Sequence, residues 1–148
     1  MSKLNQIKSF QFQQTCWKDS LNEILSVRHK VFIIEQHFDG HVLCDINDPD
    51  CYHIVVRNYQ KSVVASGRIS SEGKIGRIAV TLPYRGIGIG TKLLDQLVQL
   101  GRSMQLANLS LNAEFDNHSF YDQQKFSATG PVYMKFGVPY QMLSRKLA

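Results

Sequence analysis

The sequence predicts an α/β protein of the mixed α+β kind, in which helices pack on the faces of a sheet. One observation is the order of its elements, because runs of β-branched residues alternate with stretches whose apolar residues recur at helical spacing. A second is its size and composition: 148 residues with 43% hydrophobic and 20% charged side chains can form one globular core. We therefore expect a single domain that covers residues 1–148.

A strand, a glycine-rich loop and a helix follow one another in the middle of the chain. Ile75–Val80 is a short apolar run that suits a buried strand, and Pro83 ends it because proline has no amide hydrogen for a sheet. A loop with glycine at every second position follows. Helical spacing then predicts a helix through the next apolar residues: Leu93, Leu94, Leu97, Val98, Gly101 and Met104.

The elements on either side follow from similar patterns. Residues 10–17 can begin as an edge strand, and the capping-box pair Ser20 and Glu23 predicts a helix that runs to about Phe32. A polar, acidic loop comes next. The remaining predictions are strands at Tyr52–Arg57, Val63–Ile69 and 107–112, a helix capped by Asp116 or Asn117 that runs through Gln124, and strands around Met134 and at 141–146 beside a turn at 137–139.

The glycine loop and the helix start after it can bind an anion. Glycines let backbone amides approach a ligand, the first helical N–H groups lack partners, and Arg85 adds a positive charge. Such a site suits a phosphate or pyrophosphate, and a tight turn that binds nothing is the alternative. The dinucleotide and P-loop fingerprints fit poorly, because Thr91 stands at the third glycine position and precedes Lys92 instead of following it.

Composition and charge argue against several classes of protein. No apolar run reaches the roughly 20 residues of a membrane span, and no signal-peptide core is visible. Three cysteines without a Cys-x-x-Cys pair indicate reduced thiols and a cytoplasmic protein. The net charge of +5 comes from scattered Lys and Arg residues, so we expect no nucleic acid and no membrane as partner. The His, Cys and Asp residues lack metal-ligand spacing, so we expect no metal.

The central stretch resembles motif A of the GNAT superfamily of N-acetyltransferases, Arg/Gln-x-x-Gly-x-Gly/Ala. Here the motif begins at Arg85 and ends at Gly90. The resemblance covers nearly the whole chain and implies the GNAT acyl-CoA N-acyltransferase fold, with a central mixed, mostly antiparallel sheet flanked by helices. It also implies that acetyl-CoA (coenzyme A as acetyl donor) binds the following residues: Ile78, Ala79, Val80, Arg85, Gly86, Ile87, Gly88, Ile89, Gly90 and Thr91.

Other stretches are similar to the ElaA-like branch of this superfamily. They are residues 28–32, Glu35-Gln36, Asp45, Asp48, Phe120-Tyr121 and the closing Gly137-Val138-Pro139-Tyr140. The resemblance to acyl-homoserine lactone synthases is weaker, because those proteins are longer and fit the glycine loop less well. Three positions depart from the branch: Tyr140 replaces a histidine, Lys125 replaces a glycine, and Glu114 stands where Asn or Gln is usual.

The resemblance assigns roles to three candidate catalytic residues. A backbone N–H of the central strand polarises the thioester carbonyl in GNAT proteins, and by position it belongs to Val80. Tyr121 matches the tyrosine that protonates the leaving thiolate, with packing on the sheet as the alternative. Glu35 is the candidate general base, and an ion pair, for example with Arg28, is the alternative.

The acceptor side is less defined. Arg28, Glu35 and Gln36 are the residues expected to contact the acceptor, and His53 and His118 are further candidates for the base.

The implied function is transfer of an acetyl group from acetyl-CoA to a primary amine, by direct attack in a ternary complex. The enzyme would act as a monomer or homodimer. The acidic segment 39–50 indicates a cationic small molecule as acceptor, and a protein amine is the rival. The alternative function is a non-catalytic acyl-CoA-binding regulatory module on the same fold, which the departures Glu114, Lys125 and Tyr140 keep open.

Overall fold

A computed structural model describes residues 3–147, so Met1, Ser2 and Ala148 of the expected domain lie outside the described residues. Among residues 3–147, none of the helices has the length and apolar character that crossing a membrane requires. The helices and strands are α1 Lys3–Lys8, β1 Gln11–Thr15, α2 Trp17–Arg28, a π-helix His29–Glu35, β2 Tyr52–Arg57, β3 Val63–Ile69, β4 Ile75–Val80, α3 Ile89–Ser103, β5 Asn108–Glu114, α4 His118–Gln123, β6 Ser127–Ala128, β7 Tyr133–Lys135 and β8 Val138–Lys146.

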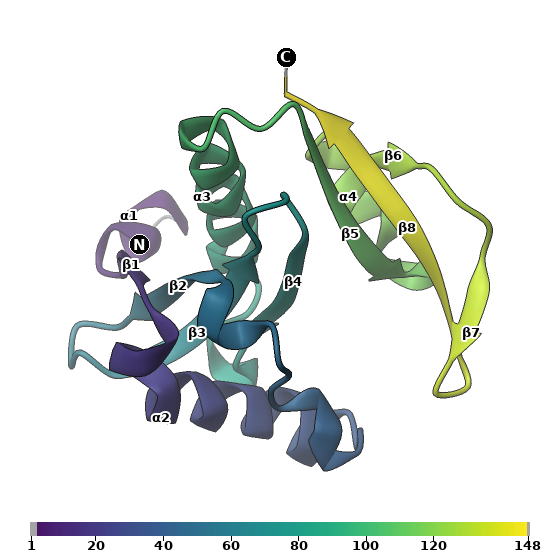
Figure 1. The fold of residues 1–148 in the computed structure, drawn as a ribbon. Helices are drawn as coiled ribbons and strands as arrows, with labels where there is room; N and C mark the ends of the chain where they lie inside the picture. Colours follow the sequence, from purple (N-terminus) through teal and green to yellow (C-terminus); the bar gives the residue numbers. More distant parts are fainter. Residues whose placement is uncertain (1–2, 148) are drawn as a thin grey trace.

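The predicted sheet is present but divided into two (Figure 1). β1 to β4 form one antiparallel sheet in chain order, and β5, β8 and β6 form a second, to which β7 adds by pairing with β8. A parallel bridge between Lys74 and Ser110 joins β4 to β5, and beyond it the two strands splay apart. The predicted α/β fold with a mostly antiparallel sheet is thus confirmed, and its division turns β4 and β5 into facing edges.

The core forms where α3 packs on the first sheet. The apolar face predicted for this helix is fully buried at Leu93, Leu94, Leu97 and Val98. Gly101 permits the close approach of β5, because a Cβ there would lie 2.7 Å from Leu109 Cδ2. Burial of each large apolar side chain contributes about 1.5–3 kcal/mol. This packing fixes α3 and therefore also the glycine loop that precedes it.

Two neighbouring side chains at a bulge in β4 lie on opposite faces of the sheet. The register with β3 shifts between Ser66 and Arg68, and Arg77 on β4 has a left-handed φ of 52°. Ile78 faces α3, since a Cβ on Gly67 would lie 3.3 Å from it, beside the leucines of that helix. Arg77 instead extends toward Asp45, on the side of the sheet that α2 covers.

The start of the first long helix differs from the prediction. α2 begins at Trp17, and Ser20 has a non-helical conformation inside it, with φ −122° and ψ 16°. The capping box is wrong because both of its side chains have other partners. The Ser20 hydroxyl lies 2.7 Å from the Thr15 hydroxyl, and Glu23 forms a two-bonded ion pair with Arg57.

Some of the other predicted helix and strand boundaries agree with the structure, and others differ from it. β2, β3 and β4 have the predicted bounds. The first helix continues past Phe32 as a π-helix, and α1 and β6 were not predicted. Asn117 occupies the N-cap position of α4, but its side chain makes no capping hydrogen bond. The last turn consists of Phe136 and Gly137, because Val138 already pairs with Lys135.

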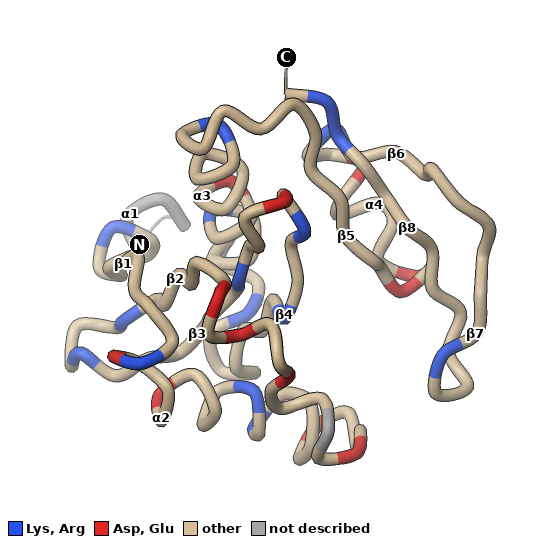
Figure 2. Tube along the Cα trace, in the orientation of Figure 1, with Lys and Arg blue, Asp and Glu red and all other residues tan. Residues whose placement is uncertain are grey.

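A network of ion pairs joins the acidic segment to β3 and α2. Figure 2 marks the positions of the charged residues along the chain. Asp48 accepts hydrogen bonds of 3.0 Å from two nitrogens of Arg28, and both side chains are 0% exposed. Arg68 connects the aspartates, with Nη1 2.7 Å from Asp45 and 2.8 Å from Asp48. The charges of these two aspartates are thus balanced by the protein's own arginines, and they do not mark a site for a cationic ligand.

Hydrogen bonds keep both aspartates ionised. Those from Arg68 hold the pKa of Asp45 well below its usual range. Burial alone would raise the pKa of Asp48, but hydrogen bonds from Arg28, the Asp45 amide and Arg68 lower it overall.

We expect Asp48→Asn to lower the free energy of unfolding by about 3–5 kcal/mol, because it leaves the Arg28 cation buried without a carboxylate to balance its charge. In the native protein, the lowered pKa values stabilise the fold fully above about pH 4, and this stabilisation is lost as the pH falls further. Urea denaturation at a series of pH values measures both effects. Asp95→Asn, on the exposed face of α3, is the control and should change stability by less than about 0.5 kcal/mol. Equal stability of the two variants would contradict this account.

Candidate active site

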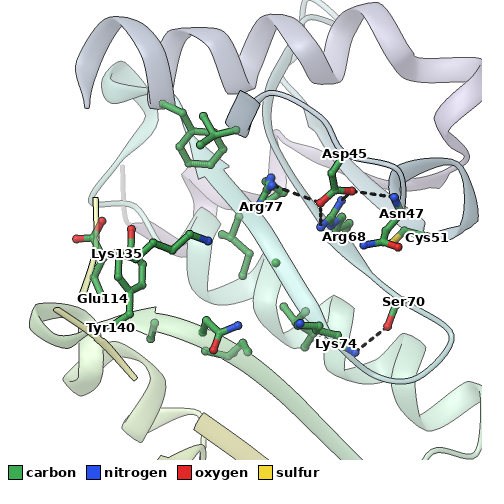
Figure 3. Close-up of a pocket in the computed structure, with 18 of the residues that line it drawn as sticks. Asp45, Asn47, Cys51, Arg68, Ser70, Lys74, Arg77, Glu114, Lys135 and Tyr140 are labelled. Atoms are coloured by element: carbon green, nitrogen blue, oxygen red, sulfur yellow. Dashed lines mark hydrogen bonds and ion pairs between the residues drawn. The ribbon is translucent and has the colours of Figure 1, made fainter. Parts of the chain in front are cut away.

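A cleft opens where β4 and β5 diverge. Its volume of about 800 Å³ lies within the range of roughly 300–1,000 Å³ that is usual for small-molecule sites. Residues 75–78 of β4 and 111–114 of β5 form two of its sides, and Tyr121, Lys135 and Tyr140 also line it (Figure 3). Strand edges that face a cleft present N–H and C=O groups with which an extended ligand can pair.

The glycine loop follows β4 at the N-terminus of α3, and its residues are not among those that line the cleft. Gly86 and Gly88 have φ values of 81° and 96°, which glycine adopts without strain. A Cβ on Gly86 would have nothing within 4 Å, so the loop faces open space there. A Cβ on Gly90 would lie 3.8 Å from Val80 and 3.9 Å from Phe120, which places the loop beside the end of β4 and beside α4.

The start of α3 provides the donors of an anion site. Lys92 N–H donates to the Gly88 carbonyl, so the amides of residues 89–91 precede the first hydrogen bond of the helix. These amides and the dipole of a 15-residue helix favour a negative group at this point. The residues present therefore fit a pyrophosphate.

Arg85 is held at the entrance of the loop. Its Nε donates to the Val80 carbonyl at 2.9 Å, and its terminal nitrogens donate to both carboxylate oxygens of Glu35, one of them at 2.6 Å. These hydrogen bonds lower the pKa of Glu35. The candidate phosphate contact and the candidate base therefore neutralise each other. Glu35 lies outside the cleft wall, whereas Gln36 lines it.

Tyr121 lies in the wall of the cleft on α4. Its ring packs edge-on against Phe120 and Phe126, with centroid distances of 5.0 and 6.4 Å. Burial and the nearby Glu114 carboxylate raise the pKa of Tyr121 to about 12. The hydroxyl group thus keeps its proton at neutral and moderately alkaline pH, as a proton donor must. The packing role and the acid role are compatible in this position.

Glu114 and Tyr140 form a polar cluster beside Tyr121. The two residues stand opposite each other on β5 and β8, and the Tyr133 ring stacks on Tyr140 at 6.1 Å. Burial and the Glu114 carboxylate raise the pKa of Tyr140. Two of the three sequence departures therefore meet at one end of the cleft, where a carboxylate lies among phenols.

The other predicted site residues lie away from the cleft. Arg28 is buried against Asp48 and does not line it, so its partner is Asp48 and not Glu35. His53 is also buried, with Nε2 2.9 Å from the Asp48 carbonyl oxygen, and His118 packs on Phe115.

Among the cleft residues that were not predicted as site residues are Arg77 and Lys135. Arg77 lines the cleft, and its signal in the sequence is a charge inside the apolar run Ile75–Val80. Lys135 lines it too, but its place depends on the pairing of β7 with β8, for which the sequence gives no local signal.

Comparison with known proteins decides the family. The family model described as an acetyltransferase (GNAT) domain matches residues 18–147. The chain belongs to the GNAT acetyltransferase family. Among its relatives is the uncharacterized protein YyaT of Bacillus subtilis, which is 26% identical over 134 residues, covering 86% of this chain and 90% of YyaT.

Solved structures of this family share the fold. Escherichia coli ElaA has a TM-score of 0.82 and 24% identity, covering 93% of this chain and 99% of that chain. An acyl-CoA N-acyltransferase from Pseudomonas aeruginosa has a TM-score of 0.83 and 24% identity, with the same coverage of 93% and 99%. The predicted GNAT membership is thus confirmed by the family model, and the fold of the chain is similar to that of ElaA.

Lys125, which stands where the family resemblance placed a glycine, adopts a conformation typical of glycine. Lys125 has a left-handed φ of 67°, the conformation in which glycine commonly ends a helix. The next residue, Phe126, is buried in the core, and its N–H donates to the Tyr121 carbonyl at 3.1 Å. The lysine therefore adds backbone strain of about 1–2 kcal/mol and leaves Tyr121 in place.

We expect Glu35→Gln to strengthen acetyl-CoA binding by about two- to five-fold, because a phosphate no longer has to displace a carboxylate from Arg85. Calorimetry measures the change. The control is Glu23→Gln, which breaks a similar ion pair with Arg57. Its affinity for acetyl-CoA should be unchanged. Weaker binding in Glu35→Gln would mean that Arg85 needs Glu35 to hold it in place for the phosphate.

Proposed function

We propose that this GNAT protein transfers an acetyl group from acetyl-CoA to a primary amine by direct attack within a ternary complex. The observation that carries the proposal is the cleft between β4 and β5, which has the protonated Tyr121 in its wall, while the glycine loop lies beside the end of β4 and beside α4. Bound acetyl-CoA would supply the activated acetyl group. The chain would bind it, orient the amine and move protons.

The donor would be held by the loop and by β4. The amides of residues 86–91 and the side chain of Arg85 would contact the pyrophosphate. Thr81 N–H donates to the Val64 carbonyl, and donors alternate along an antiparallel strand, so the Val80 N–H points away from β3. This direction supports the proposal that the Val80 amide polarises the thioester carbonyl, with Ile78 and Ala79 beside the pantetheine arm.

The reaction requires one proton to leave the amine and one to reach the sulfur. As the nitrogen–carbon bond forms and the carbon–sulfur bond breaks, Tyr121 would give its proton to the thiolate. Glu114 lines the cleft beside Tyr121 and can accept the amine proton directly or through water. Glu35 is a weaker candidate for the base than the sequence suggested, because its carboxylate is bound by Arg85 and its pKa is lowered.

We expect Tyr121→Phe to lower turnover by on the order of 10²–10⁴-fold while acetyl-CoA affinity and melting temperature barely change. The substitution keeps the packed ring and removes only the proton donor. The measurement is CoA release with a panel of amines, and Tyr59→Phe, on an exposed turn, is the control.

Two outcomes would contradict the acid role of Tyr121, and a third would contradict the proposed activity of the chain. Full turnover in Tyr121→Phe would show that another group protonates the thiolate, and unfolding would favour the packing role. If the wild-type protein binds acetyl-CoA but releases CoA with no amine or peptide, the chain is the non-catalytic acyl-CoA-binding module.

A further inference from the structure

The ion network beneath the cleft has one more cation than it has carboxylates. Arg28, Arg68 and Arg77 share Asp45 and Asp48. The first two arginines hold the aspartates through hydrogen bonds of 2.7–3.0 Å, whereas Arg77 reaches Asp45 only at 3.4 Å. The charge of Arg77 is therefore not balanced within this cluster.

The position of Arg77 allows its positive charge to attract a ligand in the cleft. It lines the cleft, and its Nε is buried with no hydrogen-bond partner among residues 3–147. Burial and the neighbouring Arg68 cation lower the pKa of Arg77, so an added negative group would stabilise the guanidinium. Its side chain lies on the face of the sheet opposite to Ile78, which packs beside α3.

Lys135 extends into the cleft from the wall opposite Arg77 (Figure 3). It precedes the two-residue turn of the β7–β8 hairpin, where Phe136 and Gly137 have φ values of 54° and 74°. The Phe136 ring lies 5.7 Å from the Phe38 ring and 5.6 Å from the Lys135 ammonium. These contacts hold the hairpin tip, and with it a second cation, beside the cleft.

The carboxylate of Glu114 lies across the cleft from Arg77 (Figure 3), in the cluster with Tyr121 and Tyr140. A ligand with an ammonium at one end and a carboxylate at the other matches this separation of charge. Its nitrogen would lie at the reacting end, and its carboxylate would meet a guanidinium, which binds carboxylates through paired hydrogen bonds.

We propose that the acceptor is a zwitterionic amino acid, whose carboxylate is bound by Arg77 and Lys135 while its amine lies beside Glu114. This inference rests on the proposed N-acetyltransferase function and names the substrate class for the same site.

Matched acceptors test the inference. CoA release is measured with ω-amino acids from glycine to aminovalerate and with the corresponding amines that lack the carboxylate. For at least one length, kcat/KM for the amino acid should exceed that of its partner by on the order of 10–100-fold. Arg77→Gln and Lys135→Gln should each lower this ratio by roughly tenfold, whereas Lys18→Gln, exposed on α2, should keep it. Ratios that are equal in all the proteins overturn the inference.

A binding measurement separates this inference from the proposed function. Calorimetry in the presence of CoA compares N-acetyl-γ-aminobutyrate with N-propylacetamide, which lacks its carboxylate. Preference for the anion that falls in both variants supports the carboxylate site even if no amine is acetylated, a result that would refute the proposed function alone. Turnover of neutral amines or lysine peptides without any preference for carboxylates overturns the inference and leaves the function standing. Because Lys135 is exposed, its variant gives the answer if Arg77→Gln does not fold.

Discussion

The buried pair of Arg28 and Asp48 holds in place the acidic segment that forms one side of the cleft. It connects α2 to the segment before β2, and Arg68 extends the connection to β3. A buried arginine cation destabilises the fold unless its carboxylate partner remains ionised. The segment is therefore fixed by charge and hydrogen bonds more than by apolar packing, and its position decides what Arg77 meets at the bulge of β4.

The groups proposed to act together come from parts of the chain that are far apart. The glycine loop is carried by α3, whose apolar face forms the core with the first sheet. Tyr121 is carried by α4, and Glu114 and Lys135 by strands of the second sheet. Their relative positions depend on the angle between the two sheets. Core packing at Gly101 and Leu109, where helix and strand nearly touch, keeps this angle defined.

Local sequence patterns predicted the helices and strands. Contacts between residues far apart in the chain explain the predictions that were wrong. β2, β3 and β4 have the predicted bounds because β-branched runs between turn residues are a local signal. The capping box failed because Arg57, far along the chain, binds Glu23. The motif identified the glycine loop, and resemblance identified Tyr121. The sequence did not predict that Arg77 and Lys135 line one cleft, since these two residues share a surface only because β4 and β5 diverge.

Within residues 3–147, the single backbone bridge recorded between β4 and β5 lies between Lys74 and Ser110, at the closed end of the cleft. Because no ladder of hydrogen bonds joins the two sheets beyond this bridge, their relative orientation depends on side-chain packing, above all where Gly101 meets Leu109. A substitution in that packing would therefore change the width of the cleft without breaking the hydrogen bonds of either sheet.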